Sequence, residues 1–322
     1  MHAACVTHLR RDNSLAIESL NENDHDAVAR LIHTSLVDWY QRNLNQGSRF
    51  GESHEPFRLM PDVYAKLDPG EALIARDIAT QAILGVCFVH PRPTHLSVGI
   101  VAIASTAQGR GVGRALLEPV VRRAREEKKP LRLVSSALNL DSFSLYTRLG
   151  FVPHTLYQDL TLPVPAEGLS APPPEGIAQV RAAGVPDTPQ MARLEFALQG
   201  ISREQDYRFF LTGEAGAWRT WVYEGPGGEL RGFLVTSHDD RSLIIGPGVA
   251  MDDKAALALL WVALDSLRGK TPLFLVPCAA EKVVRTAYAW GARNVELHVA
   301  QCLGPCAPAK GISFPTFLPE SG

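Results

Sequence analysis

The sequence has few cysteines, little net charge and no long apolar run. Its five cysteines are odd in number and widely scattered, which is not typical of a disulfide framework. The net charge of -2 argues against a general nucleic-acid-binding protein, which needs many Lys and Arg side chains for phosphate contacts. The longest apolar run, residues 255–264, is too short to span a membrane, and the first residues lack the apolar core of a signal peptide. We therefore expect a cytoplasmic protein that acts on neither nucleic acid nor membranes.

A glycine-rich turn is the most informative segment. Residues 108–114 read Gln-Gly-Arg-Gly-Val-Gly-Arg and follow an alternating, strand-like run at 97–104. An amphipathic helical pattern follows at 115–127. Such a turn presents backbone N–H groups at the positive end of a helix, so it predicts a phosphate site. The glycine spacing and the following Arg114 fit neither a Walker A loop nor a dinucleotide fingerprint. A turn that only closes a strand–helix corner is the alternative.

A second motif favours the phosphate site. Residues 139–151 read Asn-Leu-Asp-Ser-Phe-Ser-Leu-Tyr-Thr-Arg-Leu-Gly-Phe. With the glycine-rich turn, this segment resembles the paired signatures of the GNAT acetyltransferases, Gln/Arg-x-x-Gly-x-Gly/Ala and Asn-x-x-Ala-x-x-Leu-Tyr-x-x-x-Gly-Phe. The single departure is Ser142, which stands where the family has alanine. The resemblance is specific over roughly residues 70 to 160 and loose elsewhere.

The resemblance implies that acetyl-CoA is the cosubstrate. No metal is expected. In such a site the strand before the turn pairs with the pantetheine arm, and the turn holds the pyrophosphate. Asn139 contacts the pantetheine arm or an ordered water, and Tyr146 donates a proton towards the CoA sulfur. Core packing of its ring is the alternative for Tyr146. The cofactor-binding residues implied are Val101, Ala102, Ile103, Gln108, Gly109, Arg110, Gly111, Val112, Gly113, Arg114, Asn139 and Tyr146.

The general base is not evident, because residues 97–103 contain no carboxylate. The nearest titratable side chains are His90 and His95, and a neutral histidine can accept a proton near pH 7. We therefore predict His95 as the base. A turn or surface histidine is the alternative.

The acceptor wall is expected in the loop-rich segment 39–61, because the resemblance places the substrate cleft there. Two arginines could clamp an acceptor carboxylate, and a glutamate could hold an amine. Ordinary solvated loop charges are the alternative. The candidate substrate residues are Trp39, Tyr40, Arg49, Glu55 and Arg58.

The chain of 322 residues is long enough for two domains, and its composition changes in the middle. Residues 164–177 are rich in Pro and Gly and predict an extended linker. Residues 1–163 then form the catalytic GNAT domain, and 178–322 repeat the same order of elements more loosely. The predicted fold class is α/β (α+β), with two tandem GNAT-like domains. Each is expected to have a mixed, mostly antiparallel central sheet flanked by helices.

The second domain is predicted to be degenerate. Its counterpart of the glycine-rich turn, at 246–253, contains Pro247, which lacks an N–H group, and Asp252 and Asp253, which would repel a pyrophosphate. We expect a Gly-Pro-Gly turn at 246–248 and no acetyl-CoA binding by this domain. It could instead shape the acceptor site or hold a homodimer together. His298, Cys302 and Cys306 do not have the spacing of a structural zinc site.

These features together predict an acetyl-CoA-dependent N-acetyltransferase. The acceptor would be a primary amine of a small molecule or peptide, which attacks the thioester directly. Because the usual strand carboxylate is missing, a non-catalytic acyl-CoA-binding or scaffold protein is the alternative.

Overall fold

The computed structural model describes residues 14–213 and 217–316, which contain one order of elements twice. The first half comprises β1 (Leu15–Ser19), α1 (His25–Leu44), α2 (Leu59–Leu67), β2 (Leu73–Asp77), β3 (Ile83–Pro91), β4 (Leu96–Ile103), α3 (Val112–Glu126), β5 (Leu131–Ser136), α4 (Leu140–Leu149) and β6 (Val152–Thr161). The second half comprises β7 (Val180–Ala182), α5 (Thr188–Gln199), α6 (Glu204–Thr212), β8 (Trp218–Glu224), β9 (Leu230–Ser237), β10 (Ile244–Ala250), α7 (Asp253–Asp265), β11 (Leu273–Pro277), α8 (Glu281–Ala289) and β12 (Arg293–Leu303). A short strand, β13 (Ile312–Phe314), follows.

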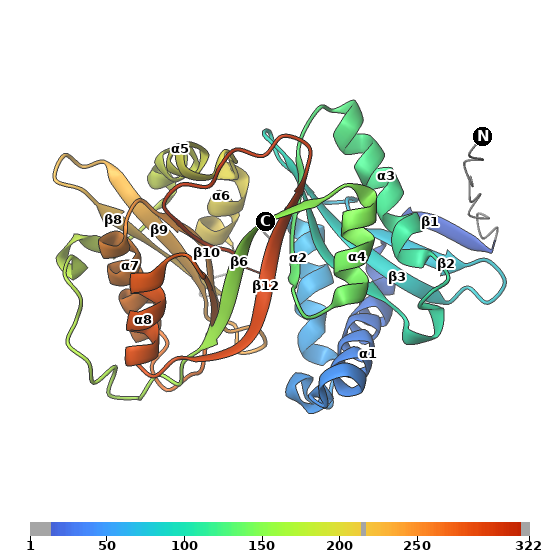
Figure 1. Ribbon diagram of the computed structural model, residues 1–322, viewed down its shortest axis with the longest axis horizontal. Coiled ribbons are helices and arrows are strands. Elements are labelled where there is room, and N and C mark those ends of the chain that lie inside the picture. Colours follow the sequence, from blue (N-terminus) through green and yellow to red (C-terminus); the bar gives the residue numbers. More distant parts are fainter. Residues whose placement is uncertain (1–13, 214–216, 317–322) are drawn as a thin grey trace, which may run out of the picture.

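The two halves exchange their last strands. The strand order is β1-β2-β3-β4-β5-β12-β6-β11-β10-β9-β8-β7, so β12 lies beside β5 and β6 lies beside β11. The two exchanged strands also pair with each other, and Figure 1 shows them between the two lobes. The predicted mixed, mostly antiparallel sheet flanked by helices is confirmed, since among the described strands only β4–β5 and β10–β11 are parallel. The two expected sheets, however, are joined into one.

Helices cover both faces of this sheet in each half. In the first half, α1 and α2 pack on one face around Ile32, Tyr64 and Phe88, whereas α3 and α4 pack on the other around Leu116 and Tyr146. In the second half, α7 and α8 share one apolar cluster and α5 and α6 share another. A small cluster at the junction contains one residue from each of the four central strands. The exchanged strands therefore have their own core, which ties the halves together.

Two segments differ from the sequence-based expectation. The predicted turn at 246–248 is part of β10, because Gly248 pairs with β9 on one side and with β13 on the other. The segment 39–61, expected to be loop-rich, contains the end of α1, two short 3-10 turns and the start of α2. Trp39 and Tyr40 consequently lie on a helix and not on a loop.

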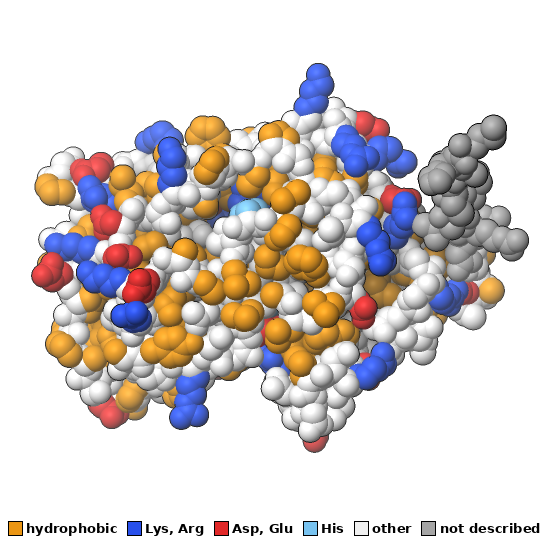
Figure 2. Space-filling view, viewed as in Figure 1, with side chains coloured by type: hydrophobic (Ala, Val, Ile, Leu, Met, Phe, Trp, Pro, Cys, Tyr) orange, Lys and Arg blue, Asp and Glu red, His pale blue; other side chains and the backbone are white. Residues whose placement is uncertain are grey.

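Apolar side chains gather over the middle of one face of the molecule, whereas most charged side chains lie towards its two ends (Figure 2). The large exposed apolar residues on the central strands and next to α4 include Leu138, Leu140, Val152, Leu156 and Val295. Within the described ranges, none of the helices combines the length and apolar character that crossing a membrane requires.

Candidate active site

A cavity of about 550 Å³ lies where β4 separates from β5. These parallel strands pair only at Leu96↔Leu131 and Ser97↔Arg132, and the β3–β4 ladder is irregular between Val98 and Val101. The edge of β4 therefore opens into the cavity beyond this point. The lining residues come from α1, from β4 and the turn after it, and from α4, so the cavity reaches both faces of the sheet. We call this cavity the pocket.

The glycine-rich turn forms one end of the pocket. Gly109 and Gly111 have φ angles of 76° and 81°, in the left-handed region that favours glycine. Helix α3 begins directly afterwards at Val112, and its first internal hydrogen bond runs from the Ala115 N–H to the Gly111 carbonyl. The first-turn N–H groups of a helix have no carbonyl partner within it, so they can bind an anion. The turn thus has the geometry that a phosphate requires.

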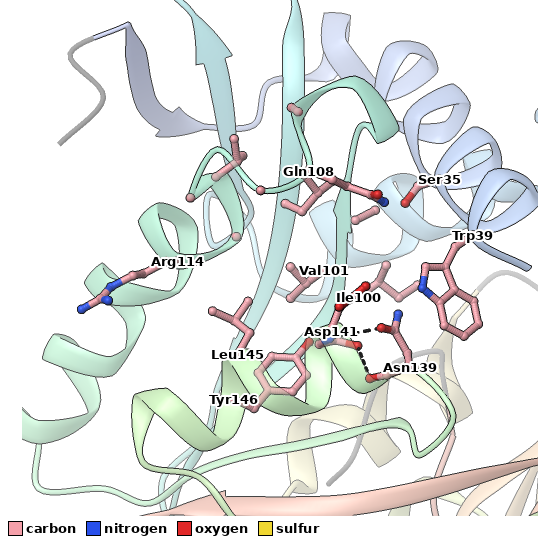
Figure 3. Close-up of a pocket in the computed structure, with 18 of the residues that line it drawn as sticks. Ser35, Trp39, Ile100, Val101, Gln108, Arg114, Asn139, Asp141, Leu145 and Tyr146 are labelled. Carbon is pink, nitrogen blue, oxygen red and sulfur yellow. Dashed lines mark hydrogen bonds between the residues drawn. The ribbon is translucent and has the colours of Figure 1, made fainter. Parts of the chain in front are cut away.

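Helix α4 forms a wall of the pocket. Asn139 caps this helix, because its Oδ1 accepts a hydrogen bond of 3.1 Å from the Ser142 N–H. Asn139 and Trp39 of α1 both line the pocket (Figure 3). Nearly two turns into α4, Tyr146 is 6% exposed and packs edge-on against Phe151 at 5.8 Å. Tyr146 therefore lines the pocket and belongs to the core at the same time.

The structure brings nearly all of the expected cofactor-binding residues around this pocket. Arg110 is the exception, since its guanidinium lies 3.8 Å from the Asp77 carboxylate. The Arg114 side chain points away along α3 (Figure 3), where it contacts Glu118 at 2.7 Å. The expected residues that line the pocket are Val101, Ala102, Ile103, Gln108, Gly109, Gly111, Val112, Gly113, Arg114, Asn139 and Tyr146.

The expected acceptor residues divide into two groups. Trp39 and Tyr40 line the pocket from α1. Arg49 lies next to them, stacked over the Tyr40 ring at 4.9 Å. Glu55 and Arg58 are not among the residues that line the pocket. Glu55 is largely exposed near His54, and Arg58 contacts Asp62 at 3.5 Å one helical turn away.

The structure does not bring His95, the predicted base, to the pocket. His95 lies just before β4, at the end of the strand remote from the pocket, and it is fully buried beside Thr94. Burial, together with the nearby Arg203 and Arg132, lowers the pKa of His95 well below 6.5. Its surroundings are the contact between the two halves, where the Ser202 N–H donates to the Thr94 hydroxyl at 2.9 Å.

A buried polar cluster that the sequence analysis missed adjoins the pocket. The Tyr40 hydroxyl donates a hydrogen bond to Glu296 on β12, and Arg49 lies 3.2 Å from the same carboxylate. His298, also on β12, pairs with Asp159 of β6 at 2.9 Å. Glu296 and His298 alternate with apolar residues in a period of two, which is the one local signal that could have indicated a half-buried strand.

The corresponding groove of the second half is filled by its own chain. Strands β10 and β11 also pair at only two positions, Ile244↔Leu273 and Ile245↔Phe274. Strand β13 then pairs with β10, and Phe314 is 1% exposed. At the helix that follows, the Asp252 carboxylate accepts a hydrogen bond from the Ala255 N–H at 2.9 Å, where a phosphate would otherwise bind.

Comparison with known proteins identifies the family of this scaffold. Residues 34–151 match the family model described as the acetyltransferase (GNAT) family. This part of the chain therefore belongs to the GNAT family, and the family and fold support an acyl-CoA-dependent acyltransferase. No curated protein matches the chain in sequence.

Solved structures resemble the chain over most of its length. A putative acetyltransferase from Pyrococcus horikoshii is 15% identical, with a TM-score of 0.68, and the match covers 92% of this chain and 93% of that one. A GCN5-related N-acetyltransferase from Sphaerobacter thermophilus is 17% identical, with a TM-score of 0.62 and coverages of 92% and 98%. A tandem GNAT protein from the clavulanic acid biosynthesis pathway is 15% identical, with a TM-score of 0.57 and coverages of 92% and 100%. The fold of the whole chain is thus that of a tandem GNAT protein.

Proposed function

We propose that this protein is an acetyl-CoA-dependent N-acetyltransferase that transfers the acetyl group directly to a primary amine of a small molecule or peptide. The observation that carries the proposal is the pocket itself. One cavity, open along the edge of β4, is lined by both GNAT motifs, with the glycine-rich turn at one end and Tyr146 in its wall. Its volume of about 550 Å³ lies within the usual range of small-molecule sites.

Each part of the pocket suits one part of acetyl-CoA. The N–H groups after Gly111 and the positive helix end would hold the pyrophosphate. The open edge of β4, from Val101 to Ile103, would pair with the amides of the pantetheine arm. The bulky side chains on the α1 side favour a short acyl group; they are Ile32, Leu36, Trp39 and Tyr40.

Tyr146 is proposed to donate a proton to the departing CoA sulfur. Tyr146→Phe removes only the hydroxyl group, so the ring contact with Phe151 is retained. We expect kcat to fall about 100-fold while the Kd for acetyl-CoA stays unchanged, because a positioned acid acts on the transition state. The measurement is thiol release from acetyl-CoA with a panel of primary amines.

A matched control comes from the second half. Tyr288 on α8 is 43% exposed, and its hydroxyl donates to Gln158. Tyr288→Phe should leave kcat at the wild-type value. If Tyr146→Phe also retained the wild-type kcat, the assigned role of Tyr146 would be wrong. Binding of acetyl-CoA without thiol release by the wild-type protein would instead support a non-catalytic acyl-CoA-binding protein.

The second groove is proposed to bind no acetyl-CoA, because β13 and the Asp252 cap take the places of pantetheine and pyrophosphate. Isothermal titration of the full chain should therefore give one acetyl-CoA per chain. A stoichiometry of two would show that β13 can be displaced.

A further inference from the structure

The Tyr40–Glu296 pair lies at the α1 side of the pocket, opposite the α3 and α4 side. Tyr40 lines the pocket, and its hydroxyl donates to Glu296 Oε1. The Glu296 side chain is only 2% exposed. Tyr40 therefore connects the wall of the pocket with a buried carboxylate.

We propose that Tyr40 and Glu296 form the proton relay that activates the acceptor amine. The inference rests on the proposed function, and it assigns the base to a residue of the second half. Strand exchange makes this possible, because β12 takes the place next to β5 in the first half. The register pairs His298 with Ser136, which brings Glu296 to the end of β5 that leads into α4.

The relay balances protons and charge. The acceptor binds as an ammonium ion and gives one proton to the Tyr40 oxygen, while the Tyr40 hydroxyl proton moves to Glu296. The freed nitrogen lone pair attacks the carbonyl carbon of the thioester, and the C–S bond breaks. The sulfur takes a proton from Tyr146, which recovers one from the nitrogen as the amide forms. Glu296 then returns its proton to solvent.

The charged groups around the pair suit this role. The Arg49 guanidinium lies 3.2 Å from the Glu296 carboxylate and neutralises it in part. A carboxylate oxygen of Asp159 and a ring nitrogen of His298 lie within 4.8 Å of the same carboxylate. Burial and the Glu296 carboxylate raise the pKa of Tyr40 far above its usual value of 10. Tyr40 therefore stays a neutral phenol that passes a proton on, and the buried acidic cluster attracts a cationic acceptor.

Two variants test the relay. Tyr40→Phe keeps the ring contacts with Trp39 and Phe50, and Glu296→Gln keeps an oxygen that can accept from Tyr40. The assay uses acetyl-CoA with benzylamine, spermidine and a peptide with a free N-terminal alanine. At pH 7 we expect kcat/KM for benzylamine and spermidine to fall about 100-fold in each variant, with an unchanged Kd for acetyl-CoA.

The pH profile separates a proton relay from a structural role. Without the relay, only amine that is already deprotonated reacts, and this fraction rises tenfold per pH unit up to the amine's own pKa, about 10.4 for a lysine-type amine. For benzylamine and spermidine the deficit of each variant should therefore shrink about tenfold for each unit above pH 7, up to the pKa of the amine. For the peptide, whose α-amino pKa is about 8, the deficit should disappear by about pH 8. A purely structural defect would lower the rate by the same factor at every pH and would overturn the inference.

The control is Tyr157→Phe, because Tyr157 is also buried but its hydroxyl bonds to Ser313 outside the pocket. This variant should retain the wild-type profile. If the wild-type protein acetylated an amine and both relay variants kept the wild-type rate, only the relay would be wrong. If the wild-type protein acetylated none of the probes, the proposed function and the relay would both be wrong.

Discussion

Replacing Arg92 with methionine is expected to lower the free energy of unfolding by about 3–5 kcal/mol, because the change breaks a buried ion pair from one side. Arg92 follows β3, and its side chain is 1% exposed. It contacts Asp68 of the first half at 2.7 Å and Asp206 of the second half at 2.6 Å. Without the Arg92 guanidinium, the carboxylates of Asp68 and Asp206 remain buried with less positive charge beside them.

The same cluster explains why the two halves should unfold together. Burial would raise the pKa of Asp68, but hydrogen bonds from His90 and Arg92 outweigh it, and the pKa lies below the usual value. Burial raises the pKa of Asp206, and this effect outweighs the lowering of the pKa by the nearby Arg92 and Arg203. Since Arg92 holds one carboxylate of each half, its loss weakens the contact between them as well as the fold of each.

The measurement is urea unfolding of the full chain, followed by circular dichroism. Arg285→Met is the matched control, because Arg285 pairs with Glu281 at 2.8 Å on an exposed surface of α8. Exposed pairs of this kind contribute less than about 1 kcal/mol, so this variant should unfold almost as the wild type does. Equal midpoints for the two variants would contradict the role given to Arg92.

The sequence predicts those motifs and elements whose signals lie in residues close together along the chain. The glycine-rich turn, the α3 pattern after it and the Asn139–Tyr146 motif of α4 all carry their information within a few residues. The structure places these segments around one pocket. Strands such as β8 (Trp218–Glu224) can be predicted in the same way, because alternating apolar and polar residues mark the strand and turn residues mark its ends.

The exchanged strands could not be predicted in the same way. A strand pattern shows which residues face the core. The neighbouring strand of β6 or β12 in the sheet, however, depends on contacts with residues more than a hundred positions away in the sequence. For the same reason Glu296 could not be connected with Tyr40, although both residues are visible in the sequence. His95 shows the reverse case: it lies close in sequence to the β4 edge of the pocket, yet it is buried at the far end of that strand.

Replacing Gly111 with aspartate is expected to weaken acetyl-CoA binding by more than 100-fold. Gly111 precedes α3, and a Cβ atom built there meets no atom within 4 Å, so the new side chain fits. Its carboxylate would lie at the proposed pyrophosphate position. Two unit charges about 5 Å apart at an effective dielectric constant of about 20 repel by about 3 kcal/mol.

Gly111→Asn is the control that isolates charge from shape. Asn and Asp tolerate the left-handed backbone of Gly111, with φ of 81°, better than other side chains do. An aspartate at a helix N-terminus also stabilises the helix slightly, so unfolding would not explain a loss of binding. We expect isothermal titration to show a loss below about 10-fold for Gly111→Asn, and salt should reduce the deficit of Gly111→Asp by screening. Equal acetyl-CoA affinities for the two variants would mean that the glycine-rich turn does not hold the pyrophosphate.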